Sequence, residues 1–336
     1  MYALTMVGIA LTVYYIITFV FDIFSFFLYA TLLVFLIRRL IKKDPHICSS
    51  FFVIVIFNGF TDLLFMIEEY FCFRIPQVGL FEYFYTEIFP SYLISGMCYT
   101  YSICQLIFIA LSGITLTVNR LFAIIFPINY QKFWSSWRLI PLIGWPLIIC
   151  IPLFIKFYYA EVDYEKDETG RISVFYIDTN LNNILWSSAI YTHIFAIIVN
   201  GILNIILIYK LKKEFNNTKK NKKEIKLDVM MAKFAFFYFI FFLLTVAVEI
   251  GMVVASNNGK FRLAADLLTS YAIVESSLVY FTPYTLLILS KDIRIKFLSF
   301  IRLDKSKVSN LNSIGQTNLE MKQVYSRRGT VMTPLR

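Results

Sequence analysis

Residues 111 to 130 of the chain read LSGITLTVNRLFAIIFPINY. This stretch continues an apolar run that is long enough to cross a membrane, and it places Asn119 and Arg120 directly before more apolar residues, Pro127 and Tyr130. A charged group drawn into lipid costs about a few kcal/mol, so such a group is usually paired or functional. Arg120 therefore either anchors the end of a membrane helix by reaching water or faces the interior of a helical bundle.

The composition of the whole chain indicates a membrane protein. Of its 336 residues, 58% are hydrophobic and only 16% are charged, more apolar surface than a soluble core needs. A helix crosses the hydrocarbon core of a bilayer with about 20 mostly apolar residues. Seven stretches meet this requirement and predict an all-α membrane protein, a seven-transmembrane helix bundle. The expected helices lie near 12–37, 48–71, 92–118, 137–158, 186–209, 230–255 and 264–290.

Two further segments follow the seventh helix. Apolar residues repeat at helical spacing beside basic ones at Ile293, Phe297, Phe300 and Ile301, which predicts an amphipathic eighth helix over 291–303 on the membrane surface. Residues 1–303 are thus expected to form one bundle domain. The polar segment 304–336 has too few large apolar residues to fold and is predicted to be a disordered tail.

The distribution of Lys and Arg predicts the orientation in the membrane. Of 32 such residues, 26 lie at or after the ends of the first, third, fifth and seventh helices. By the positive-inside rule these connections and the C-terminus are cytoplasmic and the N-terminus is outside. The net charge of +10 therefore reflects topology and the lipid bilayer as a partner, and it gives no indication of nucleic-acid binding.

The same topology assigns two loop features. The acidic segment 161–171 falls outside and is expected to be a solvated loop, with attraction of a cationic ligand as the alternative. The sequon Asn216-Asn217-Thr218 falls on the cytoplasmic side, so we expect it to be unglycosylated.

The opening stretch resembles a known receptor motif. Asn119-Arg120-Leu121, followed by Pro127 and Tyr130, is similar to the Asp-Arg-Tyr box and the trailing proline and tyrosine of rhodopsin-like G-protein-coupled receptors, with asparagine in place of the acid. The resemblance implies that Asn119, Arg120 and Tyr130 take part in signalling to a heterotrimeric G protein.

Other residues fit the same register. Asn58 and Asp62 share one face of the second helix, where the family keeps a buried aspartate for an ion, and Trp145 matches the tryptophan of the fourth helix. Pro283 and Tyr284 resemble the Asn-Pro-x-x-Tyr motif of the seventh helix and are added to the signalling residues by that resemblance.

The departures from the rhodopsin-like pattern indicate a subclass. The connection between helices four and five has no cysteine, helix six has no proline, and helix one lacks the usual asparagine. Together with the abundance of Phe and Tyr, these variants are similar to nematode serpentine chemoreceptors, most closely the gamma or V classes of the Srg superfamily. The resemblance implies the plasma membrane of a sensory cell and, for the phosphorylatable tail, an arrestin-type partner.

Polar side chains at one depth predict a binding pocket. At 1.5 Å of rise per residue, five of them reach similar levels in the outer third of the bundle, and polar groups inside a membrane are functional candidates by default. They are Tyr101, Gln105, His193, Glu249 and Glu275. They are expected to bind a small, mostly apolar ligand with one polar anchor, unless they pair with one another. Glu68 and Glu69 lie so near the interface that we expect them to pair or to face headgroups.

The remaining polar chemistry is sparse. Cys72 and Cys98 lie near the outer ends of helices two and three and could form a disulfide in an oxidising compartment. Two histidines and the lack of nucleophile or phosphate-loop motifs predict no enzyme, no metal and no cofactor. A transporter or channel remains an alternative, although inverted repeats are not visible, and a neuropeptide receptor is another.

Overall fold

A computed structural model of the chain describes residues 2–44, 47, 49–134, 136–166, 170–216 and 222–301. The chain divides into two compact units, Met1–Thr285 and Leu286–Arg336. The helices are α1 (Tyr2–Ile41), α2 (Ser50–Glu69), α3 (Ile75–Gln77), α4 (Leu93–Ile125), α5 (Pro127–Phe133), α6 (Leu139–Lys156), α7 (Thr179–Asn216), α8 (Lys222–Asn257), α9 (Phe261–Val279), α10 (Phe281–Leu289) and α11 (Lys291–Phe300). Short π-helical or 3-10 segments are η1 (Tyr70–Arg74), η2 (Phe84–Ile88), η3 (Phe89–Ser91) and η4 (Ser136–Arg138).

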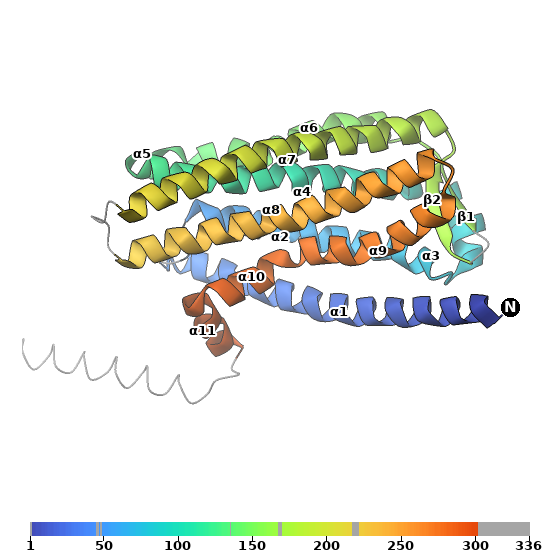
Figure 1. The fold of residues 1–336 in the computed structure, drawn as a ribbon, viewed down its shortest axis with the longest axis horizontal. Coiled ribbons are helices and arrows are strands. Elements are labelled where there is room, and N and C mark those ends of the chain that lie inside the picture. Colours follow the sequence, from blue (N-terminus) through green and yellow to red (C-terminus); the bar gives the residue numbers. More distant parts are fainter. Residues whose placement is uncertain are drawn as a thin grey trace, which may run out of the picture. The chain divides into compact units, whose positions relative to one another are not determined.

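The long helices of the first unit run along a common axis, with a β-hairpin at one end (Figure 1). We call this the hairpin end and the opposite end, where α4 carries Arg120, the Arg120 end. Among the described residues, six helices are long and apolar enough to cross a membrane, and a seventh span results if the bent pair Asp266–Val279 and Phe281–Leu289 is counted as one. The predicted helical membrane bundle is confirmed.

The seventh span is broken by a 45° bend between α9 and α10. Pro283 has no backbone N–H, so the carbonyl of Val279 loses the hydrogen bond that a continuous helix would give it. The helix accordingly ends at Val279 and starts again at Phe281. The proline thus sets the position of the break.

Helix α4 is the central helix of the bundle. In its most apolar membrane-length window 89% of residues are buried, compared with 11% for α6. Small residues let neighbours approach α4 closely: a Cβ atom built on Gly96 would lie 2.2 Å from the carbonyl oxygen of Ala160. This core position explains why residues from α2, α6, α7 and α8 meet along α4.

Several helices extend beyond their predicted bounds. Helix α1 begins at Tyr2, α4 continues to Ile125, and α7 begins at Thr179, whereas the sequence predicted starts near 12 and 186 and an end near 118. At the start of α7 the side chain of Asp178 accepts a hydrogen bond of 2.9 Å from the backbone N–H of Asn180, which caps the helix. Polar residues that hydropathy excludes from a membrane span are therefore helical here.

The segment expected to be a solvated acidic loop is an ordered hairpin where the structure describes it. Strands β1 (Val162–Lys166) and β2 (Ile172–Tyr176) pair antiparallel, with Val162 opposite Tyr176. Alternate side chains, including Tyr164 and Ile172, are buried. The all-α prediction is thus incomplete at this point, because the period-two pattern of VDYEK and ISVFY is too short to stand out in sequence.

Hydrogen bonds hold the hairpin onto the bundle. The hydroxyls of Tyr176 and Thr100 lie 2.6 Å apart, and the Tyr164 hydroxyl donates to the carbonyl of Cys72 at 3.2 Å. Burial raises the pKa of Tyr164 and of Tyr176, so both phenols stay protonated near neutral pH. Lys166 adds an exposed ion pair of 2.6 Å with Glu82.

In the second unit, Ser290 caps α11 by accepting a 3.2 Å hydrogen bond from the N–H of Ile293. The amphipathic helix predicted over 291–303 is therefore present from Lys291 to Phe300. Its last predicted residues, the tail 304–336 and the sequon positions after Asn216 lie outside the described residues.

Candidate functional site

A cavity of about 650 Å³ lies at the hairpin end of the first unit. The elements that contribute to its wall are α2, η1, α3, α4, both hairpin strands, α7, α8 and α9. Aromatic and aliphatic side chains such as Phe73, Trp186 and Val253 supply much of the lining, and Glu69, Glu165 and Glu275 supply carboxyl groups. None of its lining residues, all from the described ranges, is Lys or Arg. The cavity is thus mostly apolar with an acidic side.

A buried ionic cluster forms the acidic side of the cavity. Arg74 contacts Asp22 at 2.5 Å, Glu275 at 3.2 Å and Glu69 at 3.7 Å. Its guanidinium also donates to the Ser276 hydroxyl at 2.8 Å. Three carboxyl groups from α1, α2 and α9 thus surround one arginine, and two of them, those of Glu69 and Glu275, also line the cavity.

Neither Arg74 nor Asp22 was expected to be part of the site. Arg74 was expected among the few basic residues on the outer side, and Glu69 was expected to pair or to face headgroups. The prediction of pairing holds for Glu69, but it pairs inward with Arg74 and lines the cavity. The π-helical η1 contributes to this, because i to i+5 geometry brings residues five apart, such as Glu69 and Arg74, onto one side.

The five residues predicted to share a pocket are not all brought together. Of them only Glu275 lines the cavity. His193 and Glu249 instead form a buried pair between α7 and α8, with Nδ1 and a carboxylate oxygen 2.5 Å apart. His193 Nε2 also lies 3.3 Å from the carbonyl oxygen of Leu106 on α4. This group therefore links three helices beside the cavity, the pairing that the sequence left open as an alternative.

Tyr101 and Gln105 lie on α4 one turn apart. Tyr101 is partly buried, and Gln105 is buried with its amide nitrogen lacking a hydrogen-bond partner. Neither lines the cavity, although their neighbours Ser102 and Leu106 do. A count of depth along the helix does not say which way a side chain points around the helix axis.

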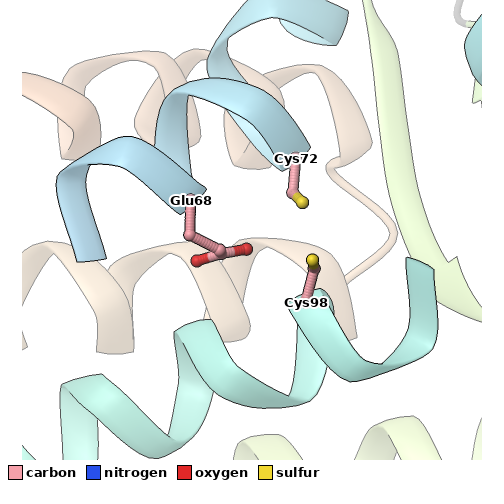
Figure 2. A group of neighbouring side chains, drawn as sticks. All are labelled: Glu68, Cys72 and Cys98. Carbon is pink, nitrogen blue, oxygen red and sulfur yellow. The ribbon is translucent and has the colours of Figure 1, made fainter. Parts of the chain in front are cut away.

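Figure 2 shows a second polar group, formed by Glu68 and Cys72 from the second span and Cys98 from α4. Of these three residues, Cys72 lines the cavity. One ligand atom from each residue lies within 4.8 Å of the others. Cys72 and Cys98, expected as a possible disulfide, are adjacent here as free thiols. Glu68 was expected to face headgroups or pair; instead its carboxylate accepts a hydrogen bond from Ser102 of α4.

A polar cluster surrounds Arg120 at the other end of the unit. Arg120 is 6% exposed, so it faces the bundle interior. Its guanidinium donates to the Asn119 amide oxygen at 2.5 Å and lies 4.2 Å above the ring of Phe51. The Tyr130 hydroxyl lies 2.6 Å from Ser50, and Ser50 accepts from the Asn119 amide at 3.0 Å. Asn119 therefore replaces the motif's acid as the acceptor for the arginine.

The other residues named by the resemblance have defined neighbours. The Tyr284 hydroxyl shares a 2.8 Å hydrogen bond with Ser25 of α1, and Pro283 sets the break of the seventh span. Asn58 donates to Ser112 at 2.5 Å, whereas Asp62 accepts from Tyr29 at 3.0 Å. Asn58 and Asp62 thus bond to α4 and α1 respectively. Trp145 donates to Thr115 of α4 at 2.8 Å.

This geometry is that of a multi-pass membrane bundle with a cavity at the hairpin end and the polar cluster around Arg120 at the opposite end. The family model of the serpentine type 7TM GPCR chemoreceptor Srv matches residues 6–303, so the chain belongs to this family. It is a chemoreceptor family and not an enzyme family, as the sequence predicted. A search of curated proteins gave no significant match. The expected placement in the wider Srg superfamily stays a prediction.

Proposed function

We propose that this serpentine receptor binds a small, mostly apolar molecule with a positively charged group in the cavity at the hairpin end, and signals to a heterotrimeric G protein at the Arg120 end. The observation that carries the ligand proposal is the lining: apolar and aromatic walls with Glu69, Glu165 and Glu275 and no lining cation among the described residues. Pockets of this size and character suit small ligands that are fixed by a few polar contacts.

The signalling proposal rests on family membership and on the cluster around Arg120. Near that end, Leu207 of α7 and Ala232 and Ala235 of α8 pack against Ile124 of α4. Outward movement of α8 would open this small apolar cluster next to Arg120 and expose a surface for the G protein. The arginine would then exchange its bonds to Asn119 and Tyr130 for bonds to the partner.

The proposed setting follows from the charge distribution. The hairpin end lies outside the cell and the Arg120 end in the cytoplasm, because the lysine-rich connection between α7 and α8 belongs to the latter. We further propose the plasma membrane of a nematode sensory cell as the location, and an arrestin-type protein as a partner of the phosphorylated tail.

The test is a G-protein reporter assay in cells, with a panel of small hydrocarbon amines and their neutral alcohol counterparts. We expect amines to activate the native receptor, and Arg120→Ala to abolish the response at equal surface level. Arg138→Ala, at an exposed arginine near the same end, is the matched control and should respond normally. Uptake of an amine without any G-protein response would indicate a transporter instead.

The acidic wall is tested by Glu275→Gln and Glu249→Gln. Hydrogen bonds to charged groups contribute about 1.5–3 kcal/mol, so Glu275→Gln should weaken amine potency about 10- to 100-fold. Glu249 is also a buried acid of the bundle but does not line the cavity, and its variant should retain native potency. Equal potency of alcohols and amines, or an unchanged response of Glu275→Gln, would contradict the charged-ligand proposal.

A further inference from the structure

The cluster of Glu68, Cys72 and Cys98 brings three metal-binding side chains together from two spans (Figure 2). Glu68 and Cys72 are four residues apart on the second span, so both face α4, where Cys98 lies. Cys72 is fully buried, and all three ligand atoms fall within 4.8 Å of one another. The ionic cluster around Arg74 does not include these residues.

A second observation concerns the hydrogen bonding of the Glu68 carboxylate. One oxygen of Glu68 accepts the hydrogen bond from Ser102, but the other, Oε1, is buried and makes no hydrogen bond of normal geometry. The Cys72 thiol interacts with the same carboxylate. Buried polar atoms are nearly always satisfied, so an orphaned carboxylate oxygen beside two thiols calls for a ligand. A bound cation would satisfy it directly.

The donor set selects the kind of cation. Two sulfur ligands exclude the hard ions Ca²⁺ and Mg²⁺, which bind through oxygen. Zinc accepts cysteine sulfur and glutamate oxygen, and tetrahedral geometry at a Zn–S distance of about 2.3 Å places ligand atoms about 3.7 Å apart. Because the ligand atoms lie within 4.8 Å of one another, the side chains would have to close by at most about 1 Å, which rotamer adjustment can supply.

We propose that Glu68, Cys72 and Cys98 bind a Zn²⁺ ion in the wall of the cavity, with the fourth coordination position open to the cavity. Cys72 lines the cavity together with Ser102, so water or a donor atom of a bound molecule can reach the ion. On binding, each thiol releases one proton to solvent and each thiolate forms one bond to zinc, so no oxidant or reductant is needed.

The proposal goes beyond the receptor function, because zinc binding is measured without ligand or G protein and can fail independently. Metal-free receptor, purified in reductant, is titrated with Co²⁺ as a spectroscopic probe and then with Zn²⁺ as competitor. We expect one sulfur-to-cobalt charge-transfer band that saturates at about one equivalent and disappears on addition of zinc. Native receptor that shows no such band would overturn the proposal.

Substitutions and matched controls locate the site. Cys72→Ser and Cys98→Ser should each weaken Co²⁺ binding at least about 100-fold, and Glu68→Gln at least about tenfold. Cys104 and Cys150 are buried free thiols that face each other's backbone carbonyls, so Cys104→Ser and Cys150→Ser should bind cobalt normally. Loss of the band in these controls instead would overturn the assignment.

Thiol labelling of the native chain gives a test that needs no variant. Zinc should protect Cys72 and Cys98 from a maleimide, as read by peptide mass spectrometry, and leave the labelling of Cys104 and Cys150 unchanged. If peptides from receptor taken at the cell surface show Cys72 joined to Cys98 by a disulfide, both sulfur ligands are consumed and the proposal is wrong.

Discussion

At the scale of single residues, the hydrogen bond between Asn119 and Arg120 leads to a prediction about signalling without ligand. Its neutral amide oxygen accepts from Arg120, so the bond is assisted by one charge only. Asn119→Asp supplies a carboxylate, and an added stabilisation of about 1 kcal/mol shifts a two-state equilibrium about fivefold. We therefore expect ligand-independent reporter output to fall about fivefold at equal surface level.

Tyr130→Phe should act in the opposite direction, because it removes the hydroxyl that bonds to Ser50 and Asn119. Asn258→Asp, at an exposed position near the hairpin end, is the control for the added charge and should leave basal output unchanged. If Asn119→Asp raised basal output, the cluster would not be a restraint on the inactive state.

Arg74 is the residue on which the buried acids depend. Its side chain is 6% exposed, and Arg74→Ala would leave three carboxylates without their common partner. Removing one member of a buried ion pair costs about 3–5 kcal/mol, so we expect this variant to lose most of its surface expression and thermal stability in detergent.

Arg74→Lys keeps the charge and loses the planar fork, and a milder loss is expected for it. The exposed Arg138→Ala is the matched arginine deletion and should unfold at the native temperature. A native-like unfolding temperature for Arg74→Ala would show that the acids are protonated and do not need the arginine.

At the scale of elements, the contact between α4 and α8 depends on a glycine. A Cβ atom on Gly113 would lie 2.8 Å from the ring of Tyr238. That ring cannot move easily, because its hydroxyl donates to the Ile109 carbonyl at 3.1 Å and the ring packs edge-to-face with Phe281 at 5.8 Å between centroids.

Gly113→Ala should therefore destabilise the receptor by about 1–3 kcal/mol, the usual cost of overpacking. The measurement is the unfolding temperature in detergent. Gly144→Ala is the control, since a Cβ there meets nothing within 4 Å and α6 is helical at that point. Equal unfolding temperatures for the two variants would mean that α4 and α8 are less closely packed than the structure shows.

Phe281 extends the ring contact at Tyr238 to further aromatic residues of α8. Besides Tyr238, it packs against Phe234 and Phe241 of α8 at 5.3 and 5.4 Å between ring centroids. Phe281 begins α10, directly after the break in the seventh span. This aromatic cluster is one contact through which the movement proposed for α8 would reach the seventh span.

At the scale of the whole molecule, the proposed orientation in the membrane has a direct test. The connection at 167–169 reads Asp-Glu-Thr, so Asp167→Asn creates a glycosylation sequon at the hairpin end with one substitution. With the hairpin end outside, this variant should carry a glycan that a glycosidase removes, as seen by a band shift on a gel.

The natural sequon at Asn216 supplies the matched comparison. Asn216 is the last residue of α7 and lies within the lysine-rich stretch 210–233, so the native receptor should show no glycosidase-sensitive band. A band in the native receptor that is lost in Asn216→Gln, together with an unmodified Asp167→Asn, would reverse the proposed orientation.

The sequence determined by itself that this is a multi-pass helical membrane protein. Hydropathy is a property of consecutive residues, so the spans could be read without knowing how they pack. The motif around Arg120 also pointed to a serpentine receptor, and the family match over residues 6–303 agrees. The exact helix ends and the hairpin were not predicted from the sequence, because caps such as Asp178 and two short strands leave weak local signals.

Only the tertiary structure decided which polar groups meet. Arg74 contacts Asp22 and Glu275, which are 52 and 201 residues away in the chain, and no periodicity relates such positions. Depth along a helix could be counted from the sequence, but the rotation of the helix about its axis depends on packing against its neighbours. As a result, Glu275 lines the cavity, whereas Glu249 pairs with His193. The apolar bilayer determines which stretches of the sequence span the membrane. Side-chain packing between the spans determines which residues form the site.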